Sequence, residues 1–377
     1  MKKKILKFIN FFIPKNNKQI AFISYPDFSD NPRALFEYIK KNDTEYKLIW
    51  LIRDIEVFKI LKEHNIQDVF FQNSLKGLFF YMKSKYIITS QTDLIGIKSA
   101  WQIYFDLWHG MPLKKFGLLK ENFKESRWSK NSKKSNYRIA TSNLTQALIS
   151  ASFGVEAKKV KVVGQSRTDF FKEDSNNYLK KLGIDKKKYK KIVLFLPTFR
   201  DFNSYKVDNI FRFDNFDSEK FTSFLKKNEI LFITKLHHID ERKAEHLSNK
   251  DNFILLKNID LRNQLIDLYH VLNEIDALIT DYSSVYIDFL IKNKPIIFIP
   301  TDLDKYRSTQ GLILEPYDRW TPGPKAYTQE GLSKELENLV LNQDNYSKKR
   351  SLITEILHKY QDINSSERIY KIIKSAK

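Results

Sequence analysis

The first motif able to do chemistry is Trp108-His109-Gly110-Met111-Pro112, which follows an apolar run at 104–107. Histidine titrates near neutral pH, so a histidine at the end of a strand can serve as a general base. Gly110 allows a sharp turn and a close approach to a ligand, and Pro112 restricts the loop. The alternative is a histidine that is only structural or exposed.

A second motif, Thr280-Asp281-Tyr282-Ser283-Ser284, interrupts an apolar run and precedes an amphipathic segment that begins at Val285. This pattern predicts a strand, a tight turn and the first turn of a helix. Helix N-termini carry unpaired N–H groups and attract phosphate, and the two serines would add hydroxyl donors. The alternative is an ordinary helix N-cap, since Asp and Ser are preferred there.

Both motifs sit in a regular alternation of strand and helix patterns, which predicts parallel βαβ units with right-handed crossovers. The expected strands are 19–24, 47–51, 68–71, 86–90, 104–107, 139–142 and 160–163, then 191–196, 231–236, 253–256, 277–280 and 295–299. Helices are expected near 55–64, 74–83 and 217–227, with another starting over 261–269. Ligands of such sheets bind at the carboxyl ends of the strands.

The chain is long enough for two domains. We expect a basic amphipathic helix at 1–17, an N-terminal Rossmann-like acceptor domain at 18–170 and a C-terminal Rossmann-like donor domain at 171–343. Helices at 344–377 would then pack back on the first domain. The predicted fold class is α/β, with two doubly wound domains facing across a cleft.

In the first 17 residues, Ile5, Phe8, Ile9, Phe12 and Ile13 follow helical spacing, and Lys2, Lys3, Lys4 and Lys7 lie among them. A basic amphipathic helix of this kind can lie on an anionic membrane surface. The alternative is a helix packed on its own domain. A signal peptide is disfavoured because the apolar region is short and interrupted, with no small-residue cleavage site.

The composition is strongly basic, with a formal net charge of +20, a pI of about 9.6 and no cysteine. Such a charge suits nucleic acid, an anionic membrane or anionic substrates. We find no nucleic-acid-binding motif, so nucleic acid is not expected as a partner. The basic stretch 120–138, which includes Lys133, Lys134 and Arg138, is expected to face solvent, an acceptor or a membrane. Arg167 could pair with phosphate in the cleft.

Taken in order, six groups of residues, which include the two motifs above, resemble the CDP-glycerol glycerophosphotransferase family of teichoic acid synthesis. They are Ser29-Asp30-Asn31-Pro32-Arg33 and Trp108-His109-Gly110 with Pro112-Leu113-Lys114; Pro197-Thr198-Phe199-Arg200; Lys235-Leu236-His237; Thr280 to Ser284; and Arg307 with Pro322-Gly323-Pro324. The resemblance covers nearly the whole chain and implies a GT-B fold. The length is similar to that of members made of the catalytic unit alone. His238 stands where the family usually has proline.

The resemblance implies a transfer of glycerol phosphate from CDP-glycerol to a hydroxyl of a lipid-linked or polymeric acceptor, with release of CMP. His109 is then the general base and His237 stabilises the donor phosphates. The other donor residues are Thr198, Arg200, Lys235, Thr280, Asp281, Ser283, Ser284, Asp288 and Arg307, with Asp281 as a helix cap and Asp288 on the ribose. Asn31, Gly110, Lys114 and Arg167 are assigned to the acceptor or cleft.

No cofactor or metal is expected, because Asp302-Leu303-Asp304 is too short a motif to predict a metal site. The expected partners are CDP-glycerol, the acceptor and an anionic membrane surface, at the cytoplasmic face of the membrane. Alternatives are a CDP-ribitol-dependent transferase, a GT-B nucleotide-sugar glycosyltransferase, a basic nucleic-acid-binding protein and a non-catalytic membrane scaffold. Release of CMP, rather than of a nucleoside diphosphate, separates the glycerol phosphate transferase from the nucleotide-sugar glycosyltransferase.

Overall fold

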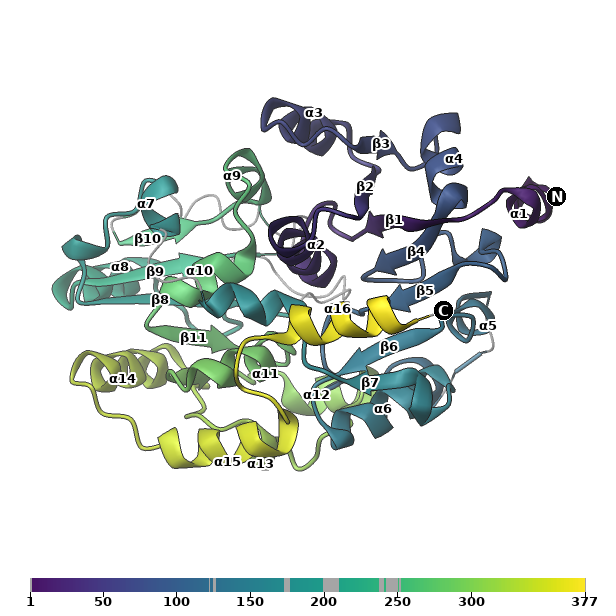
Figure 1. The fold of residues 1–377 in the computed structure, drawn as a ribbon. Helices are drawn as coiled ribbons and strands as arrows, with labels where there is room; N and C mark the ends of the chain where they lie inside the picture. Colours follow the sequence, from purple (N-terminus) through teal and green to yellow (C-terminus); the bar gives the residue numbers. More distant parts are fainter. Residues whose placement is uncertain are drawn as a thin grey trace. The chain divides into compact units, whose positions relative to one another are not determined.

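The computed structural model describes residues 2–121, 123–124, 127–172, 177–198, 210–236, 241, 250 and 252–376. The chain forms two compact units (Figure 1). The first unit contains residues 1–111, 116–172 and 357–377, and the second contains 112–115 and 173–356. Among the described residues, no helix combines the length and the apolar character needed to cross a membrane.

The first unit is built on a seven-stranded parallel sheet with strand order β3-β2-β1-β4-β5-β6-β7. Its strands are β1 (Asn16–Ile23), β2 (Lys47–Ile52), β3 (Val69–Phe71), β4 (Ser84–Thr89), β5 (Ile103–Asp106), β6 (Tyr137–Ala140) and β7 (Val160–Val162). Its helices are α1 (Lys2–Phe12), α2 (Asp30–Asn42), α3 (Ile55–Glu63), α4 (Leu75–Lys83), α5 (Arg127–Ser132), α6 (Asn143–Phe153) and α16 (Ser365–Ser375). The order reverses between β1 and β4.

The central strands form because they are apolar on both faces, as parallel strands covered by helices must be. Residues 20–23 of β1 and 49–52 of β2 are almost fully buried. On one face Trp50 stacks on Phe22, and Phe36 of α2 packs edge-on against both rings. This aromatic cluster fixes α2 against the sheet and thereby the loop that precedes α2.

The second unit repeats the plan with a five-stranded parallel sheet of order β10-β9-β8-β11-β12. Its strands are β8 (Lys191–Leu196), β9 (Ile230–Thr234), β10 (Phe253–Leu255), β11 (Ala277–Thr280) and β12 (Ile296–Phe298). Its helices are α7 (Tyr178–Lys181), α8 (Ser218–Lys227), α9 (Asn258–Asn263), α10 (Leu268–Glu274), α11 (Val285–Phe289), α12 (Leu303–Thr309), α13 (Tyr317–Trp320), α14 (Gln329–Val340) and α15 (Ser347–Leu357). Here the order reverses between β8 and β11.

The predicted fold class, two doubly wound α/β units, is confirmed by these two sheets. The predicted helix over 261–269 is wrong in its continuity. The chain forms α9 and then α10, with Leu265 between them at a positive φ of 47°. Asp267 begins the second helix, since its carboxylate accepts a hydrogen bond from the N–H of Tyr269 at 3.0 Å. A strong N-cap thus restarts the helix within one apolar pattern.

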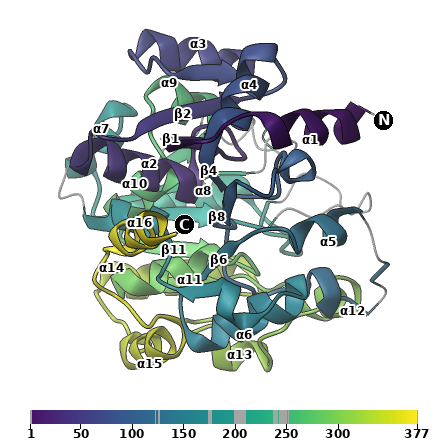
Figure 2. The same cartoon turned by 45° about the vertical axis from the view of Figure 1, so that its right-hand side comes forward.

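The last helix, α16, belongs to the first unit, where it lies along α2 and the segment at 166–172 (Figure 2). Its first N–H groups, those of Ser365 and Ser366, donate to the carboxylate of Asp169 at 2.9 and 2.7 Å. This carboxylate satisfies two of the helix's unpaired N-terminal donors. The hydroxyl of Tyr370 further along α16 donates to Asp43 after α2.

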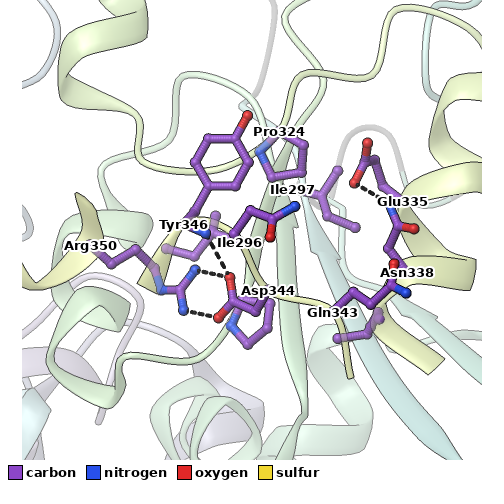
Figure 3. Close-up of a pocket in the computed structure, with 12 residues that line it drawn as sticks. Ile296, Ile297, Pro324, Glu335, Asn338, Gln343, Asp344, Tyr346 and Arg350 are labelled. Carbon is purple, nitrogen blue, oxygen red and sulfur yellow. Dashed lines mark hydrogen bonds and ion pairs between the residues drawn. The ribbon is translucent and has the colours of Figure 1, made fainter. Parts of the chain in front are cut away.

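In the second unit, Arg350 of α15 holds the chain against the amino end of β12 (Figure 3). Its guanidinium donates to Asp344 at 2.9 Å and, in a shorter contact, to the other oxygen of that carboxylate. It also donates to the side-chain and backbone oxygens of Asn293 at 3.2 and 3.1 Å. Only 1% of the arginine is exposed, and this bonding lowers the pKa of Asp344. Arg350 is therefore a structural anchor.

We expect Arg350→Met to lower the free energy of unfolding by about 2–4 kcal/mol, because it leaves buried oxygen acceptors without their charged donor. Denaturant titration measures the loss. The matched control is Lys348→Met on the exposed face of the same helix, which should change stability by less than about 0.5 kcal/mol. Equal stability of the two variants would contradict the anchoring role.

Candidate functional site

In the first unit, three loops meet where ligands of doubly wound sheets bind, at the carboxyl edge near the reversal of strand order. The loop after β1 leads into the first turn of α2, which contains Asn31, and the loops after β4 and β5 contain Ser90 and His109. The nitrogen Nδ1 of His109 lies 3.2 Å from the carbonyl oxygen of Ser90. A carbonyl can only accept, so this contact selects the tautomer with the proton on Nδ1. The other nitrogen, Nε2, then carries the lone pair that a general base needs.

The residue before His109 has an unusual backbone conformation. Trp108 has a positive φ of 55°, which is rare for a bulky residue. Its ring stacks on Phe116 at 5.3 Å and packs edge-on against Phe153 at 4.8 Å. The His109 ring lies 3.9 Å from the indole. Aromatic packing therefore stabilises a strained turn that sets the direction of the imidazole.

Asn31, which was assigned to the acceptor or cleft, is fully buried and holds the histidine loop. Its amide donates to the carbonyls of Leu107 and Trp108 at 3.3 and 3.0 Å and to Gln165 at 3.2 Å. Its side-chain oxygen accepts from the N–H of Arg167 at 3.1 Å. The conformation that presents His109 thus depends on a segment nearly 80 residues earlier in the sequence.

Arg167, predicted to meet phosphate, is engaged inside the first unit. Its Nη1 donates to the backbone carbonyl of His109 at 3.0 Å and pairs with the carboxylate of Asp30 at 2.9 Å. Only 6% of the residue is exposed. The contacts described make Arg167 a positioning residue for the histidine loop. Gly110, the next residue after His109, is buried.

Sequence reasoning missed a buried ion pair behind the turn. Asp106, the last residue of β5, accepts a hydrogen bond from the N–H of Trp108 at 3.0 Å and pairs with Arg138 at 2.6 Å. Arg138 was expected to face solvent or a membrane, but it is only 1% exposed and lies over the Phe153 ring. The available signal was an aspartate that ends an apolar strand three residues before a histidine followed by glycine.

The electrostatic surroundings keep His109 neutral. The side chain retains an exposed surface, yet desolvation by the surrounding protein lowers its pKa from the usual 6.5. Arg167 acts in the same direction, while Asp30, the carbonyl of Ser90 and Asp106 oppose the shift. A lowered pKa means that the imidazole stays unprotonated to lower pH, and an unprotonated imidazole is the form that accepts a proton.

We expect His109 to titrate below pH 6.5 and to carry its proton on Nδ1 above that pH. Long-range proton–nitrogen NMR spectra of the ring nitrogens measure both properties. A His109→Asn variant identifies the resonance by its disappearance. A midpoint above 6.5, or a neutral ring protonated on Nε2, would contradict the geometry.

The second unit has its own polar turn at the equivalent place, where β8 and β11 end side by side. The carboxylate of Asp281 accepts hydrogen bonds from the N–H and hydroxyl of Thr198 at 2.8 and 2.7 Å, and from the N–H of Tyr282 at 2.5 Å. Asp281 therefore links the carboxyl ends of both strands. Its predicted role as the helix cap is wrong, since Ser284 is the residue that precedes α11.

Ser283 and Ser284 lie half-buried at the start of α11. Ser284 is already in the right-handed helical region, and its side chain makes no capping hydrogen bond. The helix itself has only five residues before it tightens into a 3₁₀ turn. A helix this short has a small dipole, so hydroxyl and backbone donors are a better basis for anion binding here than the dipole.

An aromatic cluster that the sequence analysis missed supports this turn. The hydroxyl of Tyr317 donates to the carbonyl of Asp281 at 2.7 Å. Tyr282 stacks on Tyr306 at 4.1 Å, and its hydroxyl donates to Asp302 at 3.0 Å. Asp302 of the Asp-x-Asp motif is thus bound to a tyrosine. These tyrosines are far apart in the sequence and follow no helical or strand periodicity, so the cluster could not be predicted from the sequence.

Two residues predicted to contact the donor lie in the interior of the second unit. Thr280 is fully buried and donates its hydroxyl to the carbonyl of Leu196 at 2.7 Å. Asp288 is also fully buried and accepts the hydroxyl of Tyr269 at 2.5 Å. These contacts join β11 to β8 and α11 to α10. We therefore correct both assignments: the residues pack the unit, and burial keeps them from a ribose or phosphate.

The remaining predicted residues are spread over the second unit. Lys235 follows β9 and donates to Asn258 at 2.8 Å, and desolvation lowers its pKa. Arg307 on α12 pairs with Glu315 and Asp304 at 3.0 and 3.3 Å, and its hydrogen bond to Glu315 raises its pKa. Lys114 pairs with Leu312 in an isolated antiparallel bridge. The assignments of Arg200 and His237, and the neighbouring His238, fall outside the described residues.

Comparison with known proteins gives matches over nearly the whole chain. The profile described as CDP-Glycerol:Poly(glycerophosphate) glycerophosphotransferase matches residues 5–375. A teichoic acid glycerol-phosphate transferase of Staphylococcus aureus (strain NCTC 8325 / PS 47) is 28% identical over 375 residues, which are 95% of this chain and 93% of the relative. A teichoic acid poly(glycerol phosphate) polymerase of Bacillus spizizenii is 30% identical over 341 residues, 84% of this chain and 82% of that protein.

Among solved structures, the wall teichoic acid polymerase TagF superposes with a TM-score of 0.80 and 20% identity. The match covers 99% of this chain and 92% of the other. At this identity the match establishes the fold, which is that of the GT-B class. The GT-B fold implied by the motifs is thus confirmed.

Proposed function

The chain belongs to the CDP-glycerol:poly(glycerophosphate) glycerophosphotransferase family, and from this premise we propose how its two sites divide the reaction. The enzyme transfers glycerol phosphate from CDP-glycerol to a hydroxyl group of a lipid-linked or polymeric acceptor in teichoic acid synthesis, and CMP leaves. The single observation that carries the assignment of roles is the His109 imidazole, whose Nδ1 is bound to Ser90.

On the acceptor side, His109 acts as the general base. Its Nε2 takes the proton from the acceptor hydroxyl as the oxygen attacks the phosphorus of the glycerol phosphate group. The bond from that phosphorus to the oxygen bridging it to CMP breaks, and the electron pair leaves with CMP. Phosphoryl transfer of this kind depends on positioning and on stabilisation of the charge on the phosphate oxygens.

On the donor side, the hydroxyls of Ser283 and Ser284 and the turn tied by Asp281 bind the phosphates. Lys235, which follows β9, supplies positive charge, and we assign Arg200 and His237 to the same task of supplying charge or hydrogen-bond donors. Thr198 acts through Asp281, whose carboxylate it holds in place. Basic groups and N–H donors supply the electrostatic stabilisation, so the mechanism proposed here requires no cofactor.

His109→Ala should lower kcat about 100- to 10,000-fold, the range typical of a lost general base, while CDP-glycerol still binds. The measurements are CMP release in the steady state and donor binding by calorimetry. His64→Ala, at an exposed position after α3, is the matched control and should keep its activity. Near-normal turnover of His109→Ala would remove this residue from the mechanism.

Ser283→Ala together with Ser284→Ala should weaken CDP-glycerol binding about 10- to 100-fold, since a hydrogen bond to a charged group contributes about 1.5–3 kcal/mol. Calorimetry with CDP-glycerol measures this change directly. Ser308→Ala, an exposed serine on α12, serves as the control. Unchanged affinity of the double variant would show that the phosphates bind elsewhere.

The identity of the transferred alcohol is tested by product mass. The protein is incubated with CDP-glycerol or CDP-ribitol and a short lipid-linked acceptor, and the products are weighed by mass spectrometry. Our proposal requires a gain of glycerol phosphate and release of CMP. A gain of ribitol phosphate supports the CDP-ribitol alternative, and release of a nucleoside diphosphate supports the glycosyltransferase alternative.

We also propose that the enzyme binds the cytoplasmic face of the membrane through α1. Leu6 and Ile13 of this segment pack against the core of the first unit, and the amide of Asn10 donates to Ile97 and Gln102 at 2.7 and 2.8 Å. The opposite side leaves Phe8 and Phe12 67% and 66% exposed. The helix is thus both packed on its unit and apolar toward solvent, which suits an interfacial helix.

A further inference from the structure

Two adjoining hollows line the first unit beside α1. One, of about 410 Å³, is lined by Lys7 and Phe11 of α1 and by Lys98 and Lys134. The other, of about 630 Å³, contains Lys134 as well, together with further lysines before β6 and around the start of β7. Because they have Lys134 in common, we treat the two hollows as one feature, the lysine basin.

The lysine basin concentrates positive charge. Besides Lys7, Lys98 and Lys134, its lining includes Lys133, Lys158, Lys159 and Lys161. No carboxylate belongs to the described lining of either hollow. The nearest acid paired with these lysines is Glu156, at 2.6 Å from Lys158 and 3.9 Å from Lys159. A lining rich in lysine, with no carboxylate among its described residues, favours an anion in the basin.

The amines lie close enough to repel one another. Desolvation lowers the pKa of Lys98, and the charges of Lys7 and Lys159 lower it further. These three lysines come from α1, from the segment before β5 and from the segment before β7. The fold therefore brings together like charges that are far apart in the sequence. A bound phosphate would relieve this repulsion by supplying the missing negative charge.

The basin continues into the apolar side of α1. Phe11 lines the smaller hollow, and its ring lies 6.2 Å from Trp101, which is 58% exposed. Phe8 and Phe12 pack edge-on against each other on the exposed side of the same helix. Exposed aromatic rings beside lysines are typical of surfaces that meet the headgroup region of a bilayer.

The basin lies at the opposite edge of the first sheet from His109. Lys98 precedes β5 and His109 follows it, and Lys159 precedes β7. In a parallel sheet the amino ends of the strands share one edge and the carboxyl ends share the other. An anion in the basin is therefore separate from the phosphate that reacts.

We propose that the lysine basin binds the phosphate headgroups of anionic phospholipids, with the exposed aromatic side of α1 inserted beside them. The occupant is a lipid rather than a soluble polyanion, because the cationic hollow and the exposed apolar helix form one continuous surface. This inference rests on the proposed membrane contact and adds to it a defined headgroup site.

The test uses the full-length protein and vesicles of phosphatidylcholine with or without phosphatidylglycerol. We expect Lys98→Gln, Lys159→Gln and Lys161→Gln in one variant to weaken binding to the anionic vesicles on the order of a hundredfold, from the usual contribution of each lysine near such a surface. The matched control is Lys186→Gln, Lys187→Gln and Lys188→Gln, which removes the same charge from the second unit. This control should bind normally.

Three outcomes would overturn the proposal. Equal losses in the two triple variants would show that only total charge matters. Undiminished binding by a Phe8→Ser and Phe12→Ser variant would show that α1 does not insert into the bilayer. Its control carries Leu341→Ser and Leu352→Ser, two exposed leucines of the second unit, and should bind normally. Binding of inorganic tripolyphosphate as tightly as anionic vesicles would identify a soluble polyanion as the occupant. Thermal unfolding checks that each variant folds.

Transfer activity is measured separately, as CMP release with a water-soluble acceptor. Loss of transfer with normal vesicle binding would count against the proposed function alone. Normal transfer with vesicle binding that ignores the basin lysines would count against the headgroup site alone. The two failures are therefore distinguishable.

Discussion

The hydrogen bond from Nδ1 of His109 to the carbonyl of Ser90 is the constraint on which the chemistry depends. It joins the ends of two adjacent strands, β4 and β5, and leaves one nitrogen of the ring available as an acceptor. Asn31, Arg167 and Asp106 all act on the backbone around this ring rather than on the ring's free nitrogen. The reactive group is therefore held by buried polar contacts that a surface view would not reveal.

The fold could be predicted because the strands of both sheets appear in the sequence as short apolar runs at regular spacing. The strands and the place of His109 followed from local pattern and from the rule that parallel strands end together. The roles of Asn31 and Arg167 could not follow, because each depends on contacts spanning about 60 to 140 residues. The sequence alone does not distinguish a polar loop residue that binds a substrate from one that binds a neighbouring backbone carbonyl.

In the second unit, too, the sequence did not show which polar residues of a motif are accessible to a ligand. Thr280, Asp281, Ser283 and Ser284 share one motif, but only the serines keep hydroxyls at a half-buried surface. The side-chain oxygens of Thr280 and Asp281 form hydrogen bonds that join β8 to β11. The short length of α11 could not be read from the amphipathic pattern that continues past it.

The edge-to-edge separation of Lys98 and His109 has a consequence for the size of the acceptor. Strands rise about 3.3 Å per residue, so the four residues of β5 and their flanking turns put the imidazole at least about 13 Å from the level of the basin. If headgroups occupy that level, a hydroxyl on the bilayer surface is out of reach. The enzyme would then act only on acceptors whose hydroxyl group extends well beyond the bilayer surface. Ordinary glycerolipids, whose hydroxyl groups lie at that surface, would not be modified.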